Sequence, residues 1–367
     1  MTTPELFFDL VYVFAVTQLS HTLREHFSAR GALEVLVLFM AVWWAWNYTA
    51  WATNWIDPRH PAVRVLLLTL MLISLVMSAA IPQAFAGRGV AFAATYVGLQ
   101  VVRSAFMVAA FRGQQMARNY LQLLTWTCIA GVLWLVGGFV HDNARLLLWI
   151  GAVVIDYAAP LHGFALPRLG RTAMRDWPLA AGHLAERNQL VLLVALGESI
   201  LAVGATFASI HWTAPTAAAF GAGFVATASL WWIYFGRAQE AAETIKQAED
   251  PAHAARAGFA YAHAIMVAGV IVVAVAIDLT IAEPGANSAW KAAAAILGGP
   301  ALYLLGNALY KHAVIGGVAV SRLLAVAAVG CLIPVALAAT RLTLTVLTMF
   351  VLFCVATWTT RSSQHAN

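Results

Sequence analysis

Long apolar runs, separated by short polar stretches, fill almost the whole sequence. Each run is about as long as the ~20 residues that a helix needs to cross the ~30 Å hydrocarbon core of a bilayer at 1.5 Å per residue. The pattern therefore predicts an all-α, polytopic membrane helix bundle with about 12 transmembrane helices. The predicted spans are 7–25, 32–53, 63–86, 89–111, 119–140, 144–165, 185–209, 216–236, 256–280, 289–311, 320–339 and 342–360.

The second half of the chain repeats motifs of the first half in the same order. The matched pairs are Asp9 with Glu198, residues 43–46 (WWAW) with 231–234 (WWIY), and Asp57-Pro58 with Asp250-Pro251. Their offsets of 189, 188 and 193 residues fit one alignment. Each copy holds an even number of spans, so both copies run in the same direction through the membrane, as parallel repeats do. We predict a six-helix repeat over 1–165, a linker over 166–182 and a second six-helix repeat over 183–361.

Composition and charge place the chain in a membrane and suggest its orientation. Hydrophobic residues make up 62% of the 367 residues and charged residues only 10%, against about 25% charged in soluble domains. Of the 21 Lys and Arg residues, 14 fall on the side of the two termini, six on the other side, and Arg103 within a span. The positive-inside rule then predicts a multi-pass membrane protein with both termini in the cytoplasm.

The net charge of +5 follows from this topology and from contact with anionic lipid. No basic tract or nucleic-acid-binding motif stands out, so we expect membrane lipid as a partner and no nucleic acid. The sequence specifies no oligomeric state.

Several polar or ionisable residues lie deep within the predicted spans. Counted at 1.5 Å per residue, they fall at about one level, some 20 Å below the outer surface. They are Asp9, Asn47, Arg103, Asp156, Glu198 and His263. Such groups avoid lipid and face one another or a wet cavity. Three carboxylates and one Arg cannot all be charged and paired, so we expect at least one carboxylate to carry a proton at neutral pH.

Each of these residues also has a structural interpretation. Asp9 and Glu198 can serve as polar packing contacts, and His263 as a core histidine. Arg103 either neutralises Asp156 or Glu198 as a buried pair or tunes the acids.

Four further residues complete the candidate site. Trp44 and Trp232 stand about half-way along their spans, which favours a cavity lining or a tight core over an interfacial belt. Glu186 and Arg187 lie three and four residues after His183, so the three side chains can meet on one helix face. They form either a working cluster or an ion pair at a helix start.

Three separated motifs resemble the bacterial low temperature requirement A (LtrA) family over essentially the whole chain. They are ELFFDLVYVFAVTQLS, WWAWNYTAWATNWIDP and HLAER…LGES. The resemblance implies an integral membrane protein, in a family named for a growth phenotype in the cold. The segments around Asp9 and Glu198 resemble, more distantly, the Phe-Ser-Asp motif of lysosomal-type potassium channels, which also use six-span units. Here Phe8-Asp9 and Gly197-Glu198 lack the serine.

Two functions lead at this point, and a scaffold in a larger complex is a third possibility, favoured if neither acid matters. Parallel repeats with paired carboxylates inside the membrane are typical of a cation- or proton-linked transporter or channel, with Asp9 and Glu198 as the binding groups. The alternative is a membrane-embedded enzyme acting on a lipid or isoprenoid, in which Asp9 or Glu198 donates a proton within an aromatic-lined cavity. No nucleotide, metal or cofactor motif is present, so we expect no cofactor and no metal site.

Overall fold

The structure is a computed structural model that describes residues 1–172, 177, 180–236, 244–245 and 250–364. The chain forms two compact units, Met1–Leu184 and Ala185–Asn367. Within the described ranges the structure is helical, and eleven helical segments are long and apolar enough to cross a membrane. The predicted all-α, polytopic fold is therefore confirmed, whereas the repeat stays a prediction.

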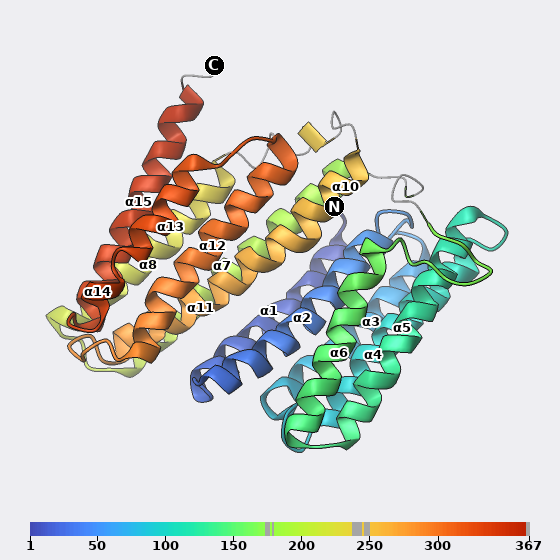
Figure 1. The fold of residues 1–367 in the computed structure, drawn as a ribbon, viewed down its shortest axis with the longest axis horizontal. Helices are drawn as coiled ribbons and strands as arrows, with labels where there is room; N and C mark the ends of the chain where they lie inside the picture. Colours follow the sequence, from blue (N-terminus) through green and yellow to red (C-terminus); the bar gives the residue numbers. More distant parts are fainter. Residues whose placement is uncertain (173–176, 178–179, 237–243, 246–249, 365–367) are drawn as a thin grey trace. The chain divides into compact units, whose positions relative to one another are not determined.

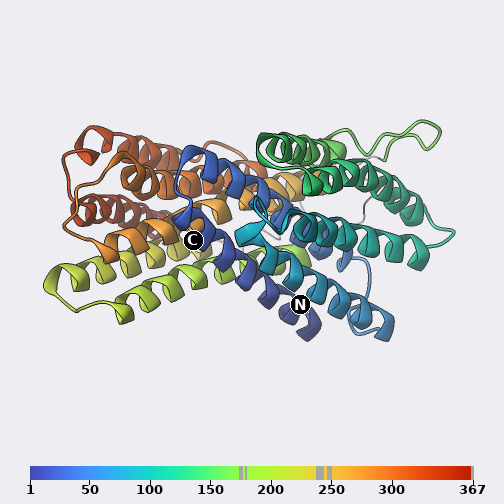
Figure 2. The same cartoon turned by 90° about the horizontal axis from the view of Figure 1, so that it is seen from below.

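Unit 1 holds six long helices that run alongside one another in both views (Figure 1; Figure 2). They are α1 (Thr3–Glu25), α2 (Ala29–Ala52), α3 (Pro61–Ala80, followed by the 3-10 turn η1, Ile81–Gln83), α4 (Gly89–Ala110), α5 (Gln115–Phe139) and α6 (Asp142–Leu161). Helix α4 packs against α3 and α5, and α2 packs against α1, α4 and α6. The side chains between α1, α2, α4 and α6 form the core in which the predicted polar residues of this unit lie.

Arg145, in the first turn of α6, links the segment after α3 to the end of α5. Its guanidinium is buried and donates to the carbonyl oxygens of Ala84, Ala86, Gly137, Gly138 and Val140 at 2.7–3.3 Å. These carbonyls follow α3 or end α5, where helix geometry leaves them without intrahelical donors. One arginine thus satisfies five acceptors in two connections.

Unit 2 contains most of α7 (Ala181–Ser209) and the helices that follow it. These are α8 (Ala214–Phe235), α10 (Pro251–Ala255), the π-helix η3 (Arg256–Ala262), α11 (His263–Ala282), α12 (Trp290–Ile315), α13 (Val320–Gly330), α14 (Ile333–Ala336) and α15 (Arg341–Gln364). Helix α12 is central and packs against α11, α13 and α15. The backbones of α11 and α12 approach so closely that a Cβ on Gly269 would lie 2.6 Å from the Tyr303 nitrogen.

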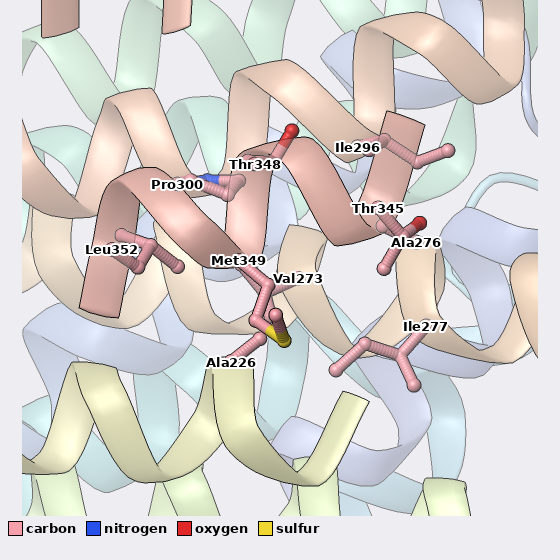
Figure 3. A pocket seen from close by; sticks show the side chains of 10 residues that line it. All are labelled: Ala226, Val273, Ala276, Ile277, Ile296, Pro300, Thr345, Thr348, Met349 and Leu352. Atoms are coloured by element: carbon pink, nitrogen blue, oxygen red, sulfur yellow. The ribbon is translucent and has the colours of Figure 1, made fainter. Parts of the chain in front are cut away.

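A small cavity of about 20 Å³ lies between α8, α11, α12 and α15 (Figure 3). Its walls include Ala226, Ile277, Pro300 and Leu352. Thr345, also on the wall, shares a 2.9 Å hydrogen bond with Thr280. A space of this size holds about one water molecule, so it is a packing defect of the core.

The predicted span 320–339 is wrong as a single membrane-crossing helix. Helix α13 ends at Gly330, and α14 begins at Ile333 with Pro334 in its first turn. Proline lacks the N–H needed to continue the preceding helix, but it fits the start of a new one. Residues 320–336 therefore form a broken apolar helix shorter than a full span.

Candidate functional site: a buried carboxylate line in unit 1

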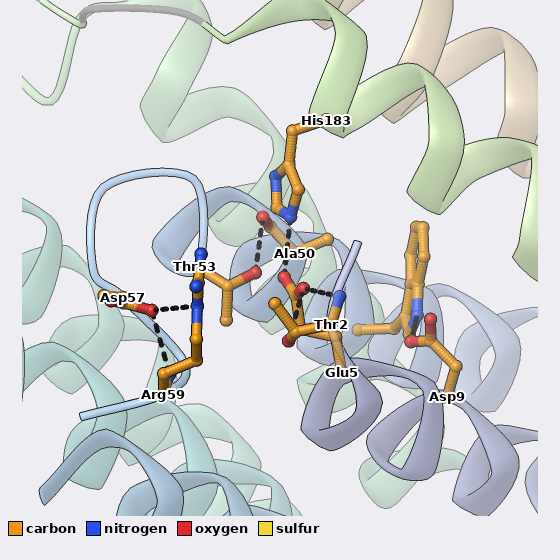
Figure 4. A network of polar contacts seen from close by, with 9 residues as sticks. Thr2, Glu5, Asp9, Ala50, Thr53, Asp57, Arg59 and His183 are labelled. Carbon is orange, nitrogen blue, oxygen red and sulfur yellow. Dashed lines mark hydrogen bonds and ion pairs between the residues drawn. The ribbon is translucent and has the colours of Figure 1, made fainter. Parts of the chain in front are cut away.

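The first turn of α1 holds a glutamate, Glu5, whose carboxylate pairs with the imidazole of His183 (Figure 4). Glu5 is fully buried, and its carboxylate accepts hydrogen bonds from the Thr2 backbone N–H at 2.8 Å and from the Thr2 hydroxyl at 2.9 Å. This capping box explains why the helix begins here. The other oxygen of Glu5 lies 2.7 Å from Nε2 of His183, whose side chain is 20% exposed.

Asp9 lies one helical turn further into the bundle on the same face of α1. It is 1% exposed, and its Oδ1 accepts a 2.8 Å hydrogen bond from the indole N–H of Trp46 on α2 (Figure 4). The carboxylate therefore points into the core of unit 1. Asn47, next to Trp46, is also buried, and its Oδ1 has no hydrogen-bond partner within the described residues.

Arg103 on α4 is fully buried and poorly paired. Its Nη1 makes only long contacts, at 3.4 Å to the Ala45 carbonyl and 3.5 Å to the Thr49 hydroxyl, and its guanidinium carbon lies 5.1 Å from the Tyr48 ring centroid. In the described part of the chain, Nε and Nη2 have no hydrogen-bond partner. Of the two acids that the sequence offers as partners of Arg103, Asp156 makes no direct ion pair with it and is held by other side chains.

Asp156 on α6 is held by two aromatic donors. Its Oδ2 accepts hydrogen bonds from the Tyr96 hydroxyl at 2.8 Å and from the Trp134 indole at 3.0 Å. Gln100, one turn along α4 from Tyr96 and three residues before Arg103, donates to the Tyr96 oxygen at 3.2 Å. Two neutral donors thus satisfy this carboxylate without a direct ion pair.

These contacts connect four helices of unit 1. We call the set the polar line, and its members are Asp9, Trp46, Thr49, Arg103, Gln100, Tyr96 and Asp156. The contacts form three groups, around Asp9, Arg103 and Asp156, which follow one another along α2 and α4, and Asn47 lies next to the first group. Trp44 and Tyr157, next in sequence to members or neighbours of the polar line, stack on each other with ring centroids 4.0 Å apart.

Unit 2 also buries two carboxylates in spanning helices. Glu198 of α7 is buried. Asp278 of α11 is buried too, and it accepts a hydrogen bond from the hydroxyl of Thr206, also on α7. Arg187 is fully buried and Glu186 is exposed.

Two predicted site residues of unit 2 have other surroundings. His263 is saturated by structural contacts, because Nε2 lies 2.8 Å from the Tyr234 hydroxyl and Nδ1 lies 2.8 Å from the Gly258 carbonyl. It is a core histidine that holds α8 against the start of α11. Trp232 is 49% exposed, so the expectation of a tight core, which Trp44 meets, is wrong for Trp232.

Sequence reasoning missed Glu5 and Asp278 because each lies close to the end of a predicted span. The usable signal for Glu5 was its spacing, since it stands three residues after Thr2 in a capping box and four before Asp9 on one helix face. Within the described residues, no three His, Cys, Asp or Glu side chains gather as metal ligands do.

Comparison with known proteins decides the family. The family described as "Bacterial low temperature requirement A protein (LtrA)" matches residues 1–357. The chain belongs to the LtrA family. A relative in this comparison, the uncharacterized protein RA0937 of Rhizobium meliloti (strain 1021), is 38% identical over 313 residues, which cover 84% of this chain and 76% of the relative. No solved structure shows significant similarity to the chain. The predicted resemblance to the LtrA family is confirmed, and the many apolar helices make this member a multi-pass membrane protein.

Proposed function

We propose that this LtrA-family protein is a cation- or proton-linked transporter or channel, with Asp9 and Glu198 as the groups that bind the cation or proton. The observation that carries the proposal is a series of titratable side chains, in which His183 of α7 is followed by Glu5 and Asp9 on one face of α1. His183 is partly exposed, Glu5 is buried against it, and Asp9 is buried about 6 Å further along the axis. Ionisable residues inside a membrane mark ion paths and proton relays.

The surroundings of Asp9 suit a group that changes its charge. The Trp46 indole can donate to the carboxylate in either protonation state, so the side chain keeps its place when a proton or cation leaves. Arg103 adds a nearby charge on the same polar line, and we assign it the role of tuning the acids. At its far end, Asp156 supplies a second carboxylate with its own donors.

We propose further that the two units are parallel copies, each with a working acid. Two arginines at corresponding places support this. Arg145 begins α6 and binds carbonyls just after α3, whereas Arg341 begins α15 and donates to the Leu279 carbonyl near the end of α11 at 3.0 Å. In this alignment Glu198 corresponds to Asp9.

The orientation belongs to the same proposal. Both termini would lie in the cytoplasm of a bacterium, with the protein in the inner membrane. In support, one end of the unit 1 helices carries more exposed arginines than the other. They are Arg59, Arg64, Arg112, Arg118 and Arg168, in connections or first helical turns, against Arg24, Arg30 and Arg88 at the other end. The positive-inside rule assigns the richer end to the cytoplasm.

The test is flux into sealed proteoliposomes under an imposed membrane potential, read with an internal pH dye and with cation-selective dyes. We expect flux with the wild type and its loss in Asp9→Asn and in Glu198→Gln, because neither amide can release a proton. Asp57→Asn is the matched control, since Asp57 is an exposed carboxylate near the same end of unit 1.

Absence of flux in the wild type would remove the transport proposal. Product formation from lipid extracts, lost in the same two variants, would then support the enzyme that the sequence left open, with the acids as proton donors.

A further inference from the structure

The break between α13 and α14 opens an apolar groove on unit 2. The groove has a volume of about 530 Å³ and lies between α12 on one side and α13 with α14 on the other. Its lining includes Trp290, Leu297, Gly298, Ala301, Val329 and Ile333. In the proposed repeat, the helix of unit 1 that corresponds to α13 and α14 is α5, and it runs unbroken over 25 residues. A volume of this size is typical of ligand pockets.

The length of the groove matches one leaflet of a bilayer. Its wall on α12 runs from Trp290 to Ala301, which is about 16 Å at 1.5 Å per residue. One half of the ~30 Å hydrocarbon core has nearly the same depth. The wall on α12 is hollow because it contains glycine and small side chains. A Cβ added to Gly298 would meet nothing within 4 Å. The hollow therefore suits a single extended hydrocarbon chain.

Polar and cationic groups gather at the Trp290 end of this groove. Lys291 is exposed, with its ammonium 5.9 Å from the Trp290 ring centroid. The segment before Trp290 is joined to the segment after α14 by the Ser288 N–H, which donates to the Ala339 carbonyl at 3.0 Å, and by the Arg341 N–H, which donates to the Ala286 carbonyl at 2.9 Å.

These backbone bonds bring a second cation to the same end. The Arg341 side chain pairs with Glu283 at 2.9 Å, while its Nε has no hydrogen-bond partner in the described part of the chain. The hydroxyl of Ser288, which is 1% exposed, likewise has none there. Both of these atoms are buried, so the exposed Lys291 is the cation that a headgroup phosphate can reach, and its ammonium suits the negatively charged phosphate oxygens.

We propose that this groove binds one hydrocarbon chain of an anionic phospholipid, whose headgroup phosphate is held by Lys291. Among the basic residues predicted on this side of the membrane, Arg30 is paired with Glu34, Arg88 and Arg145 are bound to carbonyls, and Arg341 is shared between Glu283 and the Leu279 carbonyl. Lys291 is exposed beside an apolar hollow that begins at its own level. This site lies within unit 2 and stands independently of the transport proposal.

The test is photo-crosslinking of the full-length protein in phosphatidylcholine nanodiscs. These are doped with phosphatidylglycerol whose acyl chain carries a diazirine, and labelled peptides are mapped by mass spectrometry. We expect labelling of the α12 and α13 peptides well above that of the peptides carrying Leu72 and Phe350, which are exposed apolar residues on α3 and α15. Gly298→Trp fills the hollow and lowers labelling of α12 and α13 only.

Headgroup recognition is tested with the same probe on phosphatidylcholine. We expect Lys291→Gln to lower the preference for phosphatidylglycerol about fivefold, since one basic residue near the surface contributes about that factor, while chain labelling persists. Labelling of the groove no stronger than at Leu72, labelling unchanged by Gly298→Trp, or equal labelling by the two lipids in the wild type would each overturn the proposal.

Discussion

Arg103 and Arg145 are both buried arginines of unit 1, and we predict that replacement with methionine destabilises the protein at Arg145 and is neutral or stabilising at Arg103. Arg145 donates to five backbone carbonyls at 3.3 Å or less. Arg103 has two contacts at 3.4 and 3.5 Å, and its Nε and Nη2 have no partner in the described residues. The two side chains match in type and burial and differ in hydrogen bonding.

The expected magnitudes follow from these contacts. Removing Arg145 leaves several buried carbonyls unsatisfied, at about 1–3 kcal/mol each with partial relaxation, so Arg145→Met should lower the free energy of unfolding by at least about 3 kcal/mol. Arg103 is a desolvated charge with little compensation. Replacing poorly compensated buried charge with an apolar side chain of similar volume is neutral or stabilising by about 1–4 kcal/mol, and we expect that range for Arg103→Met.

Titration of the purified protein with SDS in mixed micelles, followed by tryptophan fluorescence, measures both changes. In proteoliposomes we also expect Arg103→Met to alter flux, because its charge tunes the acids. A loss of more than about 1 kcal/mol in Arg103→Met would refute the reasoning, since it would show that the guanidinium is well compensated in the folded protein.

Two further predictions concern unit 2. Tyr234→Phe removes the hydroxyl that pairs with His263. It should lower the free energy of unfolding by about 1 kcal/mol and leave flux unchanged. Loss of flux at unchanged stability would give His263 a working role. Gly269→Ala forces a Cβ to within 2.6 Å of the Tyr303 nitrogen and should cost about 1–3 kcal/mol. The control is Gly221→Ala on α8, where a Cβ meets nothing within 4 Å, and it should stabilise the protein by up to about 1 kcal/mol. SDS titration measures both variants. Equal effects would contradict the close packing of α11 on α12.

Hydropathy predicted the number and order of the helices well, because burial in lipid demands long apolar runs. It placed several helix starts too late, as at 119 where α5 begins at Gln115. The reason is physical, since a helix continues past the hydrocarbon core into the interface, where polar residues are tolerated. Hydropathy also could not show the break at 331–332, because Gly330 and Pro334 lie in an otherwise apolar run.

The candidate site was predictable in its residues and not in its partners. Depth counting singled out Asp9, Arg103 and Asp156, and in the structure all three are buried in unit 1, on contacts that follow one another along α2 and α4. Which group satisfies each acid depends on helix rotation and rotamers, which a span pattern does not encode. Charge arithmetic left Asp156 and Glu198 open as partners of Arg103, whereas the structure holds Asp156 with Tyr96 and Trp134.

Proton or cation flux through the reconstituted protein is the most direct test of the central claim, that the buried acid of α1 carries the transported charge. We predict potential-driven flux in the wild type, its absence in Asp9→Asn despite an unfolding free energy within about 1 kcal/mol of the wild type, and wild-type flux in Asp57→Asn. Equal flux in Asp9→Asn and the wild type would contradict the account.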